Sequence, residues 1–134
     1  MELGIYTFVD RTPDPVTGHT ISAAQAADEF FPAYADVMTR LGEERGWPPM
    51  TRQQYDALLS PRGALIVGSP RQVIDKILFQ HEVFGHHRFL AQLSVGTMPH
   101  DRILRAIELF GTEVAPVVRK EIESRAGSVT SPVR

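Results

Sequence analysis

The sequence has 134 residues, a size that suits one folded domain with a buried core. Lys and Arg total 14 against 16 Asp and Glu, and the resulting formal charge of −2 argues against a nucleic-acid partner. The absence of cysteine excludes disulfides, thiolate catalysis and cysteine-based zinc sites, and it is typical of a reducing compartment.

Association with a membrane is not expected from the sequence. The first residues, Met-Glu-Leu-Gly, lack the basic region and apolar block of a secretion signal. No apolar run approaches the roughly 20 residues that a helix needs to cross a bilayer. We therefore expect a cytoplasmic protein that binds neither membranes nor nucleic acid.

The amino-terminal part of the chain predicts a strand, a loop and two helices. Residues 3–9 are apolar on both faces, as in a strand buried between two layers, and a loop rich in Pro, Asp and Thr follows. Ser22 is placed to cap a long helix that runs to about Glu44. After a Trp-Pro-Pro bend, residues 51–59 predict a short helix.

The clearest local signals surround a central helix. Residues 64–67 form a short apolar run that predicts a second strand. Ser69 can then cap a helix, and Pro70 suits the first helical position because no N–H is needed there. The apolar residues then recur at helical spacing until Gly85, which predicts the helix end.

The carboxy-terminal part predicts a third strand, a helix and a tail. Residues 89–95, Phe-Leu-Ala-Gln-Leu-Ser-Val, alternate between an apolar face and a mixed face, as in a strand. Residues 100–123 carry one apolar helical face, which Pro116 interrupts with the loss of one hydrogen bond. Residues 124–134 are polar and predict a disordered tail. The fold class expected from this order is α/β, with about three parallel strands and three main helices.

Several stretches resemble the luciferase-like flavin-dependent monooxygenases, the bacterial luciferase family. They are MELGIYTFVDRTPDP, AADEFFPAYADVMTRLGEERGWPPMTR, GALIVGSPRQVIDKI and HHRFLAQLSVGTMPHDRILRAIELFGTEVAP. In the resemblance, residues 1–23 correspond to the first barrel strand and its loop, and residues 25–123 to the carboxy-terminal barrel segment. The two blocks join directly, as though a large internal deletion had removed most of the barrel between them.

The resemblance implies a partial (β/α)8 TIM-barrel fragment over residues 1–123. It also implies an oxidoreductase that uses FMN, reduced by a separate enzyme, to insert one oxygen atom into a small organic substrate. The residues at the implied barrel mouth, and therefore the candidate flavin contacts, are Phe8, Gln92, Ser94, Gly96 and Thr97. No catalytic residue is assigned. In a fragment, the alternative that Gln92 and Ser94 simply face solvent is favoured over flavin contact.

Other candidate ligand sites have simpler structural interpretations. Gly68 and Ser69 precede a helix, where N–H groups can bind phosphate, but capping accounts for both residues. His81 and His86 are spaced unlike the paired histidines of zinc helices, which lie four residues apart on one face, and no metal is expected. His100 begins the last helix and lies near the implied mouth.

Two functions are therefore considered. The first is the flavin-dependent monooxygenase, with an activity impaired by the loss of most of the barrel, because the chemistry requires exclusion of water around the flavin. The second is a non-catalytic remnant that acts as a self-association or interaction module. Three parallel strands leave two unpaired edges, which favours a homo-oligomer in both cases.

Overall fold

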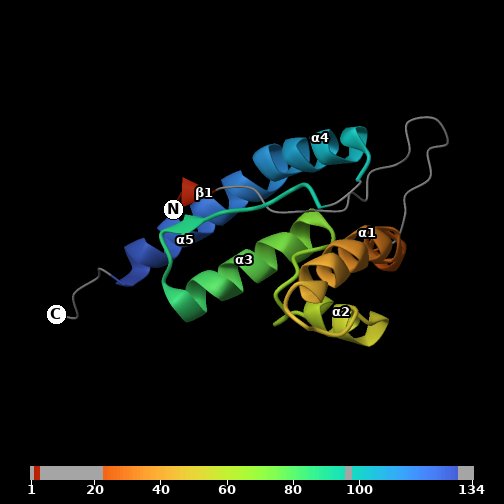
Figure 1. Ribbon diagram of the computed structural model, residues 1–134. Helices are drawn as coiled ribbons and strands as arrows, with labels where there is room; N and C mark the ends of the chain where they lie inside the picture. The colour runs from red at the N-terminus through yellow and green to blue at the C-terminus, as the bar shows by residue number, and fades with distance from the viewer. Residues whose placement is uncertain (1, 4–22, 96–97, 130–134) are drawn as a thin grey trace.

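The computed structural model describes residues 2–3, 23–95 and 98–129, and these residues are mainly helical (Figure 1). The helices are α1 (Ala23–Glu43), α2 (Arg52–Leu59), α3 (Pro70–Phe84), α4 (His100–Leu109) and α5 (Ala115–Val129), and the π-helical segment η1 (Phe110–Val114) joins the last two. Two short strands, β1 (Glu2–Leu3) and β2 (Arg88–Phe89), form a parallel pair. In Figure 1, α4 and α5 form one long rod, α3 lies beneath it, and α1 and α2 lie beyond one end of α3.

The prediction of a TIM-barrel fragment with three parallel strands is wrong. In the described residues, the only sheet is the pair of β1 with β2, and residues 64–67 form no strand. The Leu65 N–H donates instead to the Leu58 carbonyl oxygen at 3.0 Å, and the Leu65 carbonyl accepts from the Lys76 Nζ. The backbone groups of Leu65 are therefore bound by a side chain and by the end of α2 in place of a neighbouring strand.

In the described residues, only short pieces of the other two predicted strands are present. Of residues 3–9, only Leu3 lies within the described part of the chain, where it pairs with Phe89. In the predicted strand at residues 89–95, only Phe89 is in a strand, and residues 90–95 continue without a described ladder. Within the described residues, the sheet is therefore limited to two residues in each strand.

The predicted helices of the central region are confirmed. The Thr51 Oγ1 accepts from the Gln54 N–H at 3.2 Å at the start of α2, and the Gln54 side chain binds back to the Thr51 N–H at 2.9 Å. Ser69 and Gln72 repeat this reciprocal capping box at the start of α3, with Pro70 at its first position. Gly85 ends α3 in the left-handed conformation, at φ 59°. The long helix predicted from Ser22 is also confirmed as α1.

The last predicted helix forms, but it differs from the prediction in two ways. In η1 the Ala115 N–H donates to the Phe110 carbonyl, five residues back, directly before Pro116. Pro116 cannot donate a hydrogen bond, and the wider turn accommodates its ring within the helix. The helix also continues to Val129, so residues 124–129 are helical where a disordered tail was predicted. An ion pair between Arg125 and Glu121, at 3.8 Å and one turn apart, favours this extension.

Buried apolar side chains form two clusters. The first, the α3 core, joins α3, the rod and two extended segments, residues 64–67 and 89–95. Its members are Ile66, Val73, Ile77, Leu78, Phe89, Ala91, Leu93, Ala106, Phe110, Val114, Ala115 and Val118. The α1 core contains Ala27, Phe30, Tyr55 and Val95. The extended segments therefore contribute side chains to both clusters. Among the described residues, no helix combines the length and apolarity that crossing a membrane would require.

Candidate functional site

The extended segment that begins at β2 carries Gln92 and Ser94, two of the flavin contacts predicted from the sequence. The parallel register places Glu2 opposite Arg88 and Leu3 opposite Phe89. The predicted alternation of its faces is confirmed by burial: Phe89, Ala91, Leu93 and Val95 are buried, whereas Leu90, Gln92 and Ser94 are exposed. The apolar face packs into both cores, and the mixed face is the only one available to a ligand.

The structure keeps Gln92 and Ser94 on this mixed face. The Gln92 Nε2 donates to the Ser94 carbonyl oxygen at 3.1 Å, which holds the amide along the segment. The other predicted flavin contacts, Phe8, Gly96 and Thr97, lie outside the described residues. The structure thus describes two of the five candidate contacts and shows them close together in the chain.

Gln92 and Ser94 do not by themselves fit a flavin site. Both side chains are exposed, whereas flavin oxygen chemistry takes place in a site that excludes water. The only buried charged side chain of the described residues is Lys76, and its ammonium group binds the carbonyls of Leu59 and Leu65. No cation in the described core is therefore directed toward this face as a partner for the flavin phosphate.

The start of α3 is a capped helix terminus, as the sequence predicts. The Ser69 Oγ accepts from the Gln72 N–H at 3.4 Å, and the Gln72 Oε1 accepts from the Ser69 N–H at 2.9 Å. Gly68 packs tightly beneath the Gln72 side chain, since a Cβ at this glycine would lie 2.7 Å from the Gln72 Oε1. Capping contacts therefore occupy the Ser69 and Gln72 N–H groups, two of the donors that a phosphate would use.

The histidines near the end of α3 form a close pair. His81 lies in the last turn of α3, and His86 follows the left-handed Gly85. The two rings meet edge to face, with centroids 5.5 Å apart. In the described part of the chain, no three His, Cys, Asp or Glu side chains are arranged to hold a metal ion. His100 is exposed at the first position of α4.

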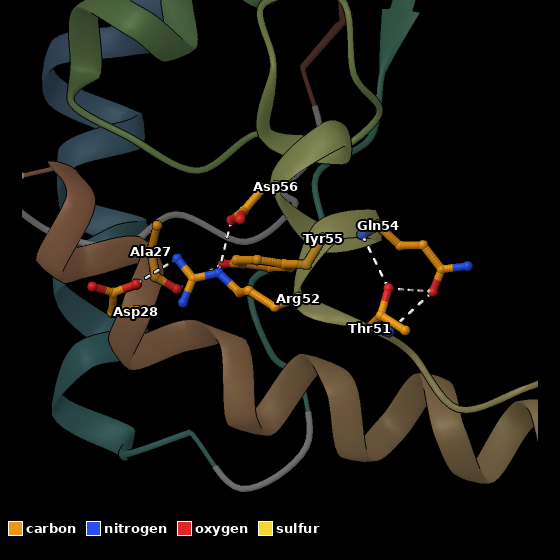
Figure 2. A network of polar contacts seen from close by, with 7 residues as sticks. All are labelled: Ala27, Asp28, Thr51, Arg52, Gln54, Tyr55 and Asp56. Atoms are coloured by element: carbon orange, nitrogen blue, oxygen red, sulfur yellow. Dashed lines mark hydrogen bonds and ion pairs between the residues drawn. The ribbon is translucent and has the colours of Figure 1, made fainter.

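A polar network between α1 and α2 was not predicted from the sequence (Figure 2). Arg52 binds Asp28 at 2.5 Å and Asp56 at 2.8 Å, and its guanidinium lies 5.3 Å from the centre of the Phe31 ring. The buried Tyr55 hydroxyl donates to the Ala27 carbonyl at 2.9 Å. The spacing of Arg52 and Asp56 predicts their pair, but Asp28 comes from another helix. Because the charged groups are about half exposed, the network mainly sets the docking of α2 on α1.

Lys76 is the second feature that sequence reasoning missed. Its Nζ donates to the carbonyl oxygens of Leu59, at 3.3 Å, and Leu65, and burial lowers the pKa of its ammonium group. A buried lysine with a lowered pKa is a candidate catalytic group. Its ammonium group, however, donates to the main chain at the end of α2 and in the loop that follows, so its role is to hold these backbone groups against α3.

Comparison with protein-family models and with curated proteins identifies no relative of this chain. No protein-family model matches the chain, and no curated protein matches it significantly.

Proposed function

We propose that the protein acts in flavin-dependent oxidation of a small organic substrate, as the resemblance to the luciferase-like monooxygenases implies. The observation that supports this proposal is the parallel pairing of β1 with β2. β1 belongs to residues 1–23 and β2 to residues 25–123, so the pairing brings together the two blocks that resemble this family. The proposal includes a cytoplasmic location, supported by a sequence free of cysteine.

In this proposal a single chain binds FMN weakly. Gln92 and Ser94 are exposed in the described structure, and little of a water-excluding enclosure surrounds them. Productive flavin binding then requires further cover over the mixed face of residues 89–95. We assign no reaction step to individual residues, because the described part of the chain does not enclose the cofactor.

We expect titration with FMN, followed by quenching of flavin fluorescence, to show weak or undetectable binding at low protein concentration. Binding should strengthen as the chain is concentrated, if association supplies the cover. The Gln92→Ala and Ser94→Ala variants should weaken it, whereas Gln53→Ala, an exposed glutamine on α2, should not. Sub-micromolar affinity of the monomer would contradict weak single-chain binding. A lack of quenching at every concentration would refute the flavin function.

A second candidate function is self-association without catalysis. The observation that favours it is a set of large apolar side chains exposed around the turn from α3 to β2. Phe84 is 75% exposed, Leu90 is 71% exposed and Val83 is 55% exposed. Neighbouring exposed side chains of this kind mark an interface more often than scattered ones do. The proposed occupant of this surface is a second copy of the chain.

We expect light scattering to report a mass above the 14.9 kDa of one chain, rising with protein concentration. Replacing Phe84 and Leu90 together by serine should restore the monomer, because both side chains belong to the proposed interface. Trp47→Ser, which removes another exposed apolar side chain on the loop before α2, serves as the control and should still associate. A monodisperse wild-type monomer at every concentration would exclude self-association.

A further inference from the structure

The turn between α3 and β2 is closed by the rings of His81, His86 and Phe89. The Gly85 N–H donates to the His81 carbonyl at 2.8 Å, and the His81 Nδ1 lies 2.9 Å from the His86 carbonyl oxygen. The His86 ring meets His81 at a centroid distance of 5.5 Å and Phe89 at 6.2 Å. His86 is therefore packed between the end of one helix and the first buried residue of the extended segment.

The environment of His86 suits a neutral ring. Its Nε2 is shielded from solvent and has no hydrogen-bond partner in the described part of the chain. Burial lowers the pKa of His86, and the neighbouring His81 and His87 lower it further, against a hydrogen bond to the Gln80 backbone that raises it. These two histidines are the titratable groups that act on His86 among the described residues, and each repels a second positive charge when protonated.

Phe89 connects this turn to the strand pair and to the core. It is 8% exposed, lies in the α3 core and pairs with Leu3 in the parallel ladder. We propose that His86 is a pH-sensitive latch, whose neutral ring closes the turn and whose protonation expels it and releases Phe89 together with the pair of β1 and β2. A proton on a shielded Nε2 without an acceptor can be solvated only if the ring leaves its place.

The sign of the pH effect follows from the lowered pKa. An unfolded His86 takes up its proton near its ordinary value of 6.5, whereas the folded ring does so only at lower pH. The unfolded state therefore binds more protons in this window, and stability falls as the pH drops below about 6.5. Between the two pKa values, the ratio of folded to unfolded protein falls by up to about tenfold per pH unit.

The test compares urea unfolding of the full chain at about pH 7.5 and about pH 5 in matched variants. The wild type and His100→Phe, which changes an exposed histidine on α4, should both lose stability at the lower pH. His86→Phe keeps a ring at the turn without a titrating group. Between about pH 7.5 and about pH 5, its ratio of folded to unfolded protein should therefore fall less than that of the wild type, by up to about tenfold for each pH unit. An equal loss in His86→Phe and the wild type would overturn the proposal.

Nuclear magnetic resonance of the wild type tests the same proposal without any substitution. We expect the His86 ring to titrate below pH 6.5 and the Phe89 amide signal to shift with the same midpoint. A His86 midpoint at or above 6.5, or a Phe89 amide that does not follow it, would refute the latch.

Discussion

Replacing Ile77 by alanine is expected to lower the free energy of unfolding by about 2–5 kcal/mol. The Ile77 side chain is 0% exposed and lies in the α3 core, between α3 and the rod. Truncation removes its buried methyl and methylene groups and leaves a cavity that the neighbours fill only in part. Because small domains are stable by only about 5–15 kcal/mol, this loss would unfold a marginal chain. Urea denaturation followed by circular dichroism measures it.

The matched control for this experiment is Ile107→Ala. Ile107 lies on α4 and is 40% exposed, so the same truncation removes much less buried surface. We expect a change within about 0.5 kcal/mol. Equal stability of Ile77→Ala and the wild type would show that this face of α3 is not packed, and the arrangement of α3 against the rod would be wrong.

Replacing Gly63 by alanine is expected to lower the free energy of unfolding by about 1–3 kcal/mol through overpacking. A Cβ at this position would lie 2.1 Å from the Leu58 carbonyl oxygen and 2.7 Å from the Ala57 carbonyl oxygen. The Leu58 carbonyl also accepts the Leu65 N–H at 3.0 Å. Relief of the clash therefore disturbs the contact between the end of α2 and the next segment. Thermal unfolding of the two proteins measures the effect.

Gly111→Ala is the matched control, and we expect it to raise the free energy of unfolding where Gly63→Ala lowers it. Gly111 is exposed within η1, and a Cβ there would meet no atom within 4 Å. Because alanine restricts the unfolded chain, this change should stabilise the protein by about 0.4–1 kcal/mol. If Gly63→Ala were as stable as Gly111→Ala, the close approach of Gly63 to α2 would be disproved.

The helices could be predicted because their signals are local. Ser69, Pro70 and Gly85 mark both ends of α3 within a few residues, and the structure places these ends where the sequence predicts them. The alternation of residues 89–95 was predictable for the same reason, since a buried face leaves a period of two in any extended chain.

The strands could not be predicted in this way, because a strand needs a partner that the local pattern does not identify. Leu65 lies in an apolar run with strand character, but its backbone groups bind Leu58 and Lys76. The candidate flavin contacts depend on distant segments in the same way. The pattern places Gln92 and Ser94 on one face, yet what covers that face depends on distant segments. Contacts such as that of Arg52 with Asp28, which lie 24 positions apart, have no sequence period.

The π-helical turn before Pro116 helps to keep the apolar side chains of α4, η1 and α5 on one face of the rod, where they form an apolar stripe. Ala106, Phe110, Val114, Val118 and Ile122 follow one another at intervals of four residues, and all five belong to the α3 core or pack on it. In a regular α-helix such a stripe drifts by about 40° per interval, because each residue advances by about 100°. The π-helical turn in η1 contains more residues than an α-helical turn, so each residue advances by a smaller angle and part of this drift is offset. The stripe can therefore follow α3 along its length without the supercoiling that an uncorrected four-residue repeat would impose.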